Sequence, residues 1–371
     1  MRCPSVAPED HGALDVMEKA LKPLGFKCTR LPFEDAKAAR VENLYARLGT
    51  SGKNLCFAGH TDVVPPGDLS LWTTPPYAPE IRDGVLYGRG ASDMKTAIAA
   101  WVVACAEYIK EKGQPKGSLS LLITGDEEAV AINGTRKVLE WCKKHNETID
   151  ACIVGEPTNP KALGDMIKIG RRGSVSFTIE VRGVQGHVAY PLNAKNPVPV
   201  MAAIIHALSL HKIDTGTEHF QPSNLEFSTV DVNNPTDNVI PASAKATCNI
   251  RFNDTQTAKK LEAWVDSVCK SAMKEGYSYT LTSRHTGDAF LTKPGFLSDI
   301  VSAAVKKITG KTPELSTTGG TSDARFIKDY CPVVEFGLIN VTAHRVNEAM
   351  PVADIENLVK IYKEVIRAFF A

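Results

Sequence analysis

Five short apolar runs in this chain each lead into a residue that can bind a metal ion. Apolar runs bounded by Gly or Pro are typical of buried strands. An open α/β sheet binds its ligands beyond the carboxyl ends of its strands. We therefore expect these residues to gather at one edge of a sheet, where two histidines and several carboxylates suit a metal hydrolase. The runs and the residues after them are 54–58 with His60 and Asp62, 85–87 with Asp93, 118–124 with Asp126, Glu127 and Glu128, 151–154 with Glu156, and 332–336 with His344.

The composition favours neither a nucleic-acid partner nor a membrane partner. The chain has 371 residues, enough for two domains, and a formal net charge of +1, which gives no field that attracts nucleic acid or anionic lipid. Its longest apolar stretch, 97–106, is too short to span a bilayer, and no apolar segment of signal-peptide type follows Met1. The 9 cysteines lack a C-x-x-C pair, which favours a reducing compartment. We expect a cytoplasmic enzyme.

The order of the expected elements indicates an inserted domain. From His11 to about Arg172, and again from Pro294, strands alternate with helices, which is typical of a mostly parallel sheet in an α/β domain. Between these parts the order βαββαβ is that of a ferredoxin-like unit. We predict a catalytic domain from residues 1–172 and 287–371, interrupted at 173–286 by a small domain that acts as a lid over the site. The elements expected in the small domain are strands 173–182, 224–232, 244–253 and 277–284 and helices 198–211 and 258–274.

Each part of the predicted site also has a plainer interpretation. A carboxylate at Asp62 would fix the tautomer of a ligating His60, yet the pair alone is more often a capping Asp beside a surface His. Asp93 alone is most often a helix N-cap, and a carboxylate that bridges two cations is the functional alternative. The acids 126–128 suit a solvated helix start, or a site in which Glu127 is the general base and Glu128 a ligand. Their joint placement at strand ends favours the metal site.

Outside this set the signals are weaker. Arg171, Arg172 and Arg251 flank strands of the small domain, either as ordinary surface charge or for bidentate recognition of carboxylates. The chain has no G-x-S-x-G nucleophile elbow and no phosphate-binding G-x-x-x-x-G-K-[ST] loop, and we expect 319–323 to be a loop that contacts substrate. We interpret the remaining histidines as structural: His11, His145, His206, His211, His219 and His285.

Motifs along nearly the whole chain resemble the di-zinc aminoacylase and carboxypeptidase family. The four motifs that this family shares widely are Gly59-His-Thr-Asp-Val-Val-Pro65, Gly88-Arg-Gly-Ala-Ser-Asp-Met-Lys95, Gly125-Asp-Glu-Glu128 and Gly155-Glu-Pro-Thr158. Segments 171–177, 186–191, 238–241, 319–323 and 344–348 match as well. The resemblance also implies a cis peptide bond after Asp93.

The resemblance implies a role for each matched residue. His60 and Glu156 would hold one zinc ion, Glu128 and His344 the other, and Asp93 would bridge them; cobalt would substitute for zinc. Asp62 would orient His60, and Glu127 would carry the proton from the attacking water to the leaving amine. His187 would reach over from the partner subunit of a homodimer to stabilise the oxyanion. The residues implied to line the substrate site are Arg171, Tyr190, Asn238, Arg251, Gly320 and Thr321.

Some of these segments point, within the family, to hydrolysis of N-succinyl-LL-2,6-diaminopimelate to succinate and LL-2,6-diaminopimelate. That substrate carries carboxylates at both ends, which suits the arginines. A deacylase of the same family acting on acetylornithine is the nearest alternative, although an acetyl group has no distal carboxylate. A non-catalytic binding protein is the alternative of a different class, disfavoured because all five ligands and Glu127 are present.

The chain departs from the family pattern in two places. An amphipathic helix usually precedes the segment 4–8, and here the chain starts almost at that segment. The stretch 183–186 reads Gly-Val-Gln-Gly, where Gly-Arg-Gly or a similar sequence is more common before the histidine.

Overall fold

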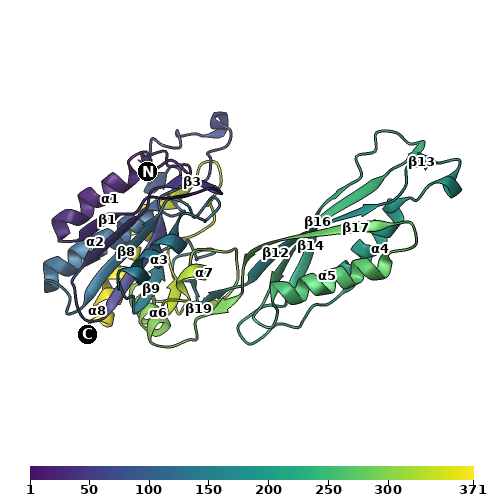
Figure 1. Ribbon diagram of the computed structural model, residues 1–371. Coiled ribbons are helices and arrows are strands. Elements are labelled where there is room, and N and C mark those ends of the chain that lie inside the picture. Colours follow the sequence, from purple (N-terminus) through teal and green to yellow (C-terminus); the bar gives the residue numbers. More distant parts are fainter. The chain divides into compact units, whose positions relative to one another are not determined.

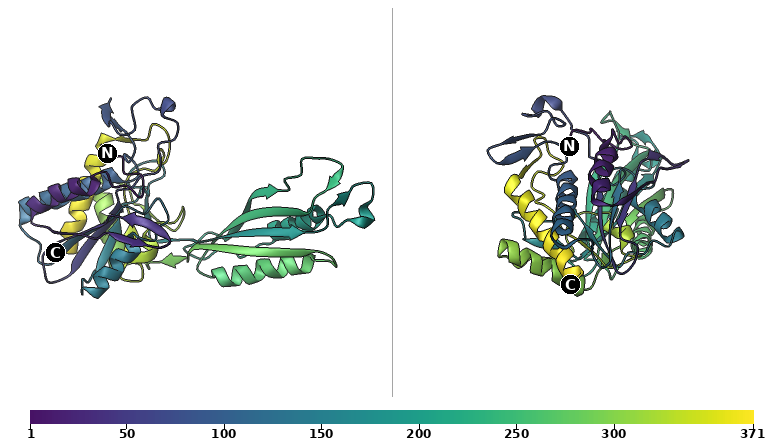
Figure 2. Two further views of the ribbon diagram at one scale, coloured as in Figure 1. Left: turned by 45° about the horizontal axis from the view of Figure 1, so that its top comes forward. Right: turned by 90° about the vertical axis from the view of Figure 1, so that its left-hand side faces the viewer.

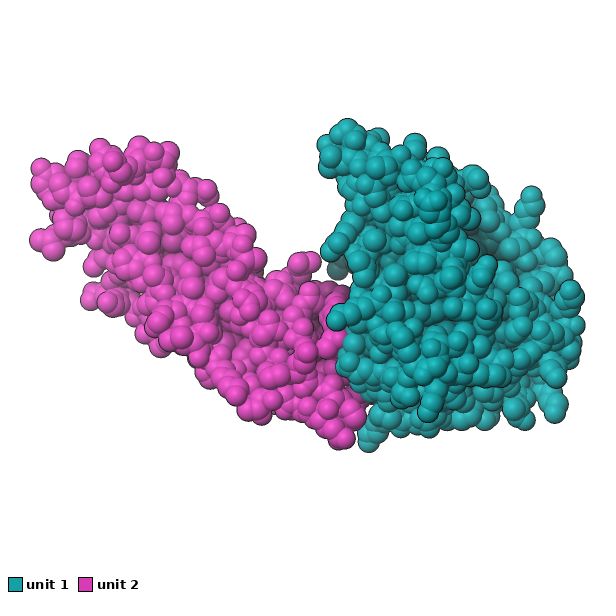
Figure 3. Space-filling view, turned by 180° about the vertical axis from the view of Figure 1, so that it is seen from behind, with its two compact units in different colours: residues 1–170, 292–316, 322–371 teal, residues 171–291, 317–321 magenta.

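The chain forms two units, and the second is inserted into the first. The computed structural model describes residues 1–371. Unit 1 comprises residues 1–170, 292–316 and 322–371, and unit 2 comprises residues 171–291 and 317–321 (Figure 3). The sequence-based domain boundaries, after residues 172 and 286, stay a prediction. No helix has the length and apolar character needed to cross a membrane.

A mixed sheet of eight strands forms the centre of unit 1, in the order β1-β4-β8-β5-β9-β20-β10-β19. The four neighbours β8, β5, β9 and β20 are parallel, while β4 and β10 run antiparallel to them on either side. The predicted mostly parallel sheet is confirmed. The strands are β1 (Lys27–Arg30), β4 (Leu44–Leu48), β5 (Asn54–His60), β8 (Ser118–Thr124), β9 (Ala151–Val154), β10 (Met166–Lys168), β19 (Glu314–Ser316) and β20 (Val333–Glu335).

Helices cover both faces of this sheet (Figures 1 and 2). On one face Phe57 of β5 stacks on Trp101 of α2 with ring centroids 4.8 Å apart, and Tyr362 of α8 meets Trp101 edge-on at 5.2 Å. On the other face Trp141 of α3 contacts Tyr45 of β4 at 5.6 Å. Burial of such aromatic rings dominates the energetics of a core. The helices of unit 1 are α1 (Ala13–Leu21), α2 (Lys95–Lys112), α3 (Thr135–Lys144), α6 (Phe296–Thr309), α7 (Ala324–Ile327) and α8 (Val352–Phe369).

The strand expected at 85–87 is present but lies outside the large sheet, which corrects the expectation of five strand ends in one layer. It is β7 (Val85–Tyr87), the middle strand of a separate antiparallel sheet with β6 (Glu80–Arg82) and β21 (Ala349–Pro351). Asp83 and Gly84, with φ of 48° and 75°, join β6 to β7. Asp-Gly is the residue pair that a two-residue hairpin turn prefers, and a hairpin forms its own small sheet.

Unit 2 has the predicted ferredoxin-like order and a matching sheet. Its four strands are antiparallel in the order β14-β16-β12-β17. Along β12 buried and half-buried residues alternate, because alternate side chains face the helices. Phe177, Ile179, Cys248 and Ile250 pack there with residues of α4 and α5. The elements are β12 (Gly173–Arg182), α4 (Pro197–Leu210), β14 (Asn224–Asp231), β16 (Ser243–Phe252), α5 (Ala258–Ala272) and β17 (Ser278–Gly287).

Candidate metal centre

Two strand ends and one loop form the first ligand group. His60 is the last residue of β5, and Glu156 follows the parallel neighbour β9 by two residues. Asp93 comes from the loop between β7 and α2. The Nε2 atom of His60 lies 3.1 Å from Asp93 Oδ1 and 3.7 Å from Glu156 Oε1. The carboxyl ends of adjacent parallel strands therefore meet here, as an open α/β sheet requires.

A second ligand group shares Asp93 with the first. His344 Nε2 lies 3.2 Å from Asp93 Oδ2 and 2.8 Å from Glu128 Oε1. Asp93 thus turns one carboxylate oxygen to each histidine. In both groups the potential ligand atoms lie within 4.8 Å of one another. The structure brings the five predicted ligands together, and Asp93 belongs to both groups.

Asp62 connects His60 to the acidic loop after β8. The backbone carbonyl of Asp62 lies 2.9 Å from His60 Nδ1, whereas its carboxylate oxygen Oδ1 lies 3.6 Å from the same nitrogen. That carboxylate accepts hydrogen bonds from the backbone N–H groups of Glu127 at 3.3 Å and Glu128 at 2.8 Å. The carbonyl therefore makes the closer contact to the ring, and the carboxylate positions the two acids.

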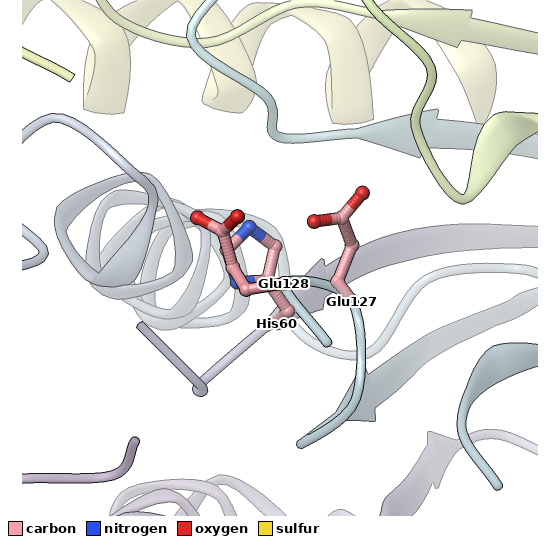
Figure 4. Close-up of side chains that lie close together, drawn as sticks. All are labelled: His60, Glu127 and Glu128. Atoms are coloured by element: carbon pink, nitrogen blue, oxygen red, sulfur yellow. The ribbon is translucent and has the colours of Figure 1, made fainter. Parts of the chain in front are cut away.

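Glu127 points to the same side as the imidazole of His60 and the carboxylate of Glu128 (Figure 4). Its carboxylate belongs to a third group with His60 and Glu128, again within 4.8 Å. Asp126 holds this loop in place by accepting the backbone N–H groups of Ala131, Ile132 and Asn133. The carboxylate of Glu127 therefore lies beside the predicted ligands, within reach of a proton transfer there.

The crowding of acids shifts the titration of the whole cluster. Burial, with the charges of Asp323, Glu128 and Asp93, raises the pKa of Glu127 well above its usual range. Burial, with the charges of Asp93 and Glu127, does the same to the pKa of Glu156. Hydrogen bonds to Asp93 and Glu128 raise the pKa of His344 to about 10. Without a cation, protons on imidazoles and carboxyl groups offset the repulsion between the acids.

These residues fit a pair of divalent cations. Five carboxylates, those of Asp62, Asp93, Glu127, Glu128 and Glu156, face only two imidazoles. Glu156 Oε1 is buried and has no hydrogen-bond partner, an arrangement that costs free energy unless a cation takes that position. Histidine nitrogens with carboxylate oxygens are ligands that Zn²⁺ accepts. The peptide bond between Asp93 and Met94 is cis, as expected.

Sequence reasoning gave Asp323 no separate role, although it lies inside the 319–323 segment. Asp323 is buried, accepts a hydrogen bond from Thr135 Oγ1 at 2.6 Å, and contributes to the raised pKa of Glu127. The sequence signal was an acid directly after Gly-Gly-Thr-Ser. Its spatial neighbours could not be read from the sequence, because Thr135 lies far from it in the chain.

The other predicted residues lie in unit 2, in two groups at opposite ends of its sheet. The first group surrounds the point where the chain enters unit 2: Arg171 Nη1 donates to the carbonyl of Thr318 at 3.4 Å, next to Gly320 and Thr321. Arg251 pairs in register with Ser174 at that end of β12. We call this group the base of unit 2.

The second group lies beyond Arg182, the far end of β12, and we call it the tip. His187 and Tyr190 have ring centroids 5.6 Å apart, and the N–H of Val188 donates to the carbonyl of Asn238 at 3.1 Å. The short strands β13 (Gly186–His187) and β15 (Val239–Ile240) pair there. Since β12 has 10 residues, roughly 3.3 Å each, base and tip are separated by about 30 Å within one copy of unit 2.

Comparison with known proteins identifies the class to which this fold and site belong. Residues 56–368 match the model of Peptidase family M20/M25/M40, and the chain belongs to that family. Among solved structures it is similar to an M20 family metallo-carboxypeptidase from Sulfolobus solfataricus, with a TM-score of 0.78 and 18% identity over 99% of this chain and 97% of that one. The match to that structure supports the fold alone.

Two curated relatives are far more similar in sequence, and both are named succinyl-diaminopimelate desuccinylase. The protein from Rhodospirillum centenum is 56% identical over 100% of this chain and 95% of its own length. The protein from Parvibaculum lavamentivorans is 55% identical over 100% of this chain and 94% of its own length.

Zinc affinity should rise with pH between about 6 and 8. Ligands bind metal only when deprotonated, and His344, His60 and Glu156 all have raised pKa values in the metal-free protein. Calorimetric titration in buffers of different ionisation enthalpy should show protons released with each zinc ion bound. The stability of the metal-free protein should change with pH in the opposite direction. Protonated His344 contributes fully to the free energy of unfolding below about pH 6.5, and this contribution is lost as the pH rises through about 10. A zinc affinity that stays constant or falls over this range would contradict the protonated cluster.

Proposed function

We propose that the chain is a zinc-dependent amidohydrolase that cleaves N-succinyl-LL-2,6-diaminopimelate to succinate and LL-2,6-diaminopimelate. The observation that carries this proposal is the full-length identity of 56% and 55% to two succinyl-diaminopimelate desuccinylases. The clustered ligands His60, Asp93, Glu128, Glu156 and His344 support it from the structure. The activity is a step of lysine biosynthesis, for which a cytoplasmic location is suited.

The proposed centre holds two zinc ions per subunit, and cobalt can replace them. His60 and Glu156 would hold one ion, Glu128 and His344 would hold the other, and Asp93 would contact both. Such ions, when bound, would lower the pKa of a coordinated water and polarise the amide carbonyl. Asp62 keeps His60 and the loop of Glu127 in register through the contacts described above.

Glu127 carries the proton in the proposed reaction. Its carboxylate takes a proton from the attacking water and then delivers that proton to the amide nitrogen, so that the amine leaves neutral. Its burial favours this task, because burial disfavours the charged form of a carboxyl group and so helps the carboxylate to accept a proton. The same group therefore acts first as base and then as acid.

The base of unit 2 suits a substrate with carboxylates. Arg251 and Arg172 lie close enough that the charge of Arg251 adds to the burial that lowers the pKa of Arg172. Two neighbouring, half-buried guanidinium groups repel each other, so an anion bound between them, such as a carboxylate, is favoured. We assign substrate contacts to Arg171, Arg251, Gly320 and Thr321 at the base, and to Tyr190 and Asn238 at the tip.

The tip of unit 2 completes the site of a second copy in our proposal. Leu192 is 98% exposed and Tyr190 is 65% exposed, next to His187. Apolar side chains this exposed and grouped together mark a contact surface. Because His187 lies about 30 Å from the base of its own unit 2, one substrate can contact both groups when they come from two subunits. The enzyme is then a homodimer in which His187 of one subunit stabilises the oxyanion in the site of the other.

A direct test compares two substrates after loading the protein with zinc. We expect kcat/KM for N-succinyl-LL-2,6-diaminopimelate to exceed that for acetylornithine by at least about 100-fold, because a site with arginines for a distal carboxylate leaves them unpaired with an acetyl group. Chelation should abolish turnover, and zinc or cobalt should restore it. Equal turnover of both substrates would favour the deacetylase alternative. If neither substrate is turned over, the result would favour a non-catalytic binding protein.

Replacing Glu127 by Gln should remove turnover and leave metal binding intact. Loss of a general base costs about 10²- to 10⁴-fold in rate. Glu140→Gln, which changes an exposed acid on α3, is the matched control and should keep full activity. Zinc content measured on the same samples tells whether Glu127 acts as a general base or as a metal ligand. Near-normal turnover in Glu127→Gln would refute the assignment, as would a loss of zinc that explains the inactivity.

Mixing two inactive variants should restore activity if the site is shared between subunits. In a mixed dimer of Glu127→Gln and His187→Ala, one of the two sites has an intact Glu127 and an intact His187. After subunit exchange, followed with differently tagged chains, we expect up to about one quarter of the parental turnover, since half of the dimers are mixed and each has one complete site of two. Demonstrated exchange without any recovery would disprove the assignment of His187 to the partner.

A further inference from the structure

A buried ion pair with no part in the proposed reaction lies directly behind the metal centre. Arg89 is 2% exposed and Glu348 is 0% exposed, and Arg89 Nη1 lies 2.9 Å from Glu348 Oε2. Burying two charges is costly unless each also makes further hydrogen bonds. The bonds that this pair makes converge on the backbone of the loops that carry the ligands.

Glu348 organises the loop that ends in Asp93. Its Oε1 accepts the backbone N–H groups of Ser92 at 2.7 Å and Asp93 at 2.9 Å, and its Oε2 accepts that of Gly90 at 3.0 Å. The N–H of Gly88 donates to the backbone carbonyl of Glu348 at 2.9 Å. Hydrogen bonds to an ionised acceptor are roughly twice as strong as neutral ones. One side chain thus fixes the backbone of Asp93.

Arg89 extends this connection to two further loops. Its Nη2 donates to the carbonyl of Pro65, in the loop that follows His60 and Asp62, at 3.2 Å. Its Nη1 donates to the carbonyl of Arg345, the residue after His344, at 3.1 Å. The loop that follows His60 and the loops that carry Asp93 and His344 therefore meet at a single ion pair.

The two metal subsites depend on this pair to different degrees. His60 lies within the hydrogen-bonded ladder between β5 and β8, and Glu156 follows β9, so both are positioned by buried strands. His344 lies in a loop with φ of 63°, and its side chain is 51% exposed. Glu348 is four residues from His344 and bonds directly to the Asp93 loop. It is therefore the residue that fixes the His344 loop against Asp93.

We propose that Glu348, together with Arg89, is a positioning residue that sets the spacing between Asp93 and His344 and so maintains the subsite of Asp93, Glu128 and His344. This inference rests on the proposed metal centre. Substituting Gln for Glu348 preserves the shape but turns an amide NH₂ group toward backbone donors. Four groups donate to this carboxylate, namely the backbone N–H groups of Gly90, Ser92 and Asp93 and Nη1 of Arg89. Two of them then face a donor, and Arg89 remains buried without a counter-charge.

The test is the binding of zinc and of cobalt to the purified full chain, by calorimetry and by cobalt absorption spectra. We expect the parent to bind two ions tightly. Glu348→Gln should keep the ion at His60 and Glu156 and bind the other about 10- to 100-fold more weakly, the usual effect of losing a partner behind the ligands. The cobalt spectrum should lose the contribution of one ion.

Glu147→Gln is the matched control for a general loss of stability. Glu147 pairs with Arg47 and accepts a hydrogen bond from Tyr45 Oη at 3.1 Å. It lies near the amino end of β5, where Asn54 Nδ2 donates to Thr148 O at 2.7 Å, and so at the opposite end of that strand from His60. We expect this variant to lose stability and still bind two ions with parental affinity.

Each outcome decides the proposal. Selective weakening of one ion in Glu348→Gln, with two ions retained in Glu147→Gln, supports it. Equal weakening of both ions, or no change in either, overturns it while the metal centre stands. A parent chain that binds no ion overturns the metal centre itself. If Glu348→Gln does not fold, Arg89→Lys keeps the charge but not the reach to both carbonyls, and the same selective loss is expected, to a smaller extent.

Discussion

Repulsion among buried carboxylates is the constraint on which this site depends. Asp93, Glu127, Glu128 and Glu156 converge around His60 and His344, with Asp62 beside His60. The chain stabilises some of these acids with its own donors, as when Asp62 accepts two backbone N–H groups. Others lack such donors, and Oε1 of Glu156 accepts no hydrogen bond. Cations complete the set, so folding and metal binding are thermodynamically linked.

The parallel strands bring this concentration of charge about by simple geometry. β8, β5 and β9 are adjacent and parallel, so residues just beyond their ends share one edge although they are far apart in sequence. The strands are buried on both faces by aromatic packing such as that of Phe57 and Trp101. A rigid apolar layer thus holds ionised groups that would otherwise separate. Burial of the apolar core stabilises the fold, whereas burial of the charged groups at the sheet edge destabilises it. The hydrophobic burial offsets the free-energy cost of burying these charges.

Much of the fold was predictable, because its signals are local. The strands at 118–124, 151–154 and 173–182 are found at those bounds, since apolar runs and strict alternation report burial directly. The βαββαβ order of unit 2 is confirmed for the same reason. The prediction that strand 85–87 ends in the same sheet as the other four was wrong, because sequence periodicity does not tell which sheet a strand joins. Asp83-Gly84 was the available signal, a hairpin turn that ties the strand to its neighbour.

The site was predictable as a set of residue types but not as a set of contacts. Strand ends indicated that His60, Glu128 and Glu156 would meet, and the structure brings their ligand atoms together; metal binding by them stays a prediction. The contacts that hold these residues could not be inferred, because partners such as Thr135 and Asp323, or Arg89 and Glu348, are joined only by the folded chain. The local sequence pattern indicates which residues can bind a metal ion or transfer a proton. Only the tertiary structure shows which backbone groups hold those residues in place.

The length of unit 2 gives a physical reason to divide one site between two chains. A ferredoxin-like unit buries its helices on one face of a sheet whose strands are up to 10 residues long. Arginines at the base and His187 at the tip are thus held apart by a stiff sheet that cannot shorten. A single copy cannot bring both ends of unit 2 to one small substrate, whereas the two copies of the proposed dimer would present base and tip to each other reciprocally. In the proposed dimer, Arg251 binds a substrate carboxylate and the partner subunit's His187 binds the oxyanion. Substrate binding is then coupled to dimer formation.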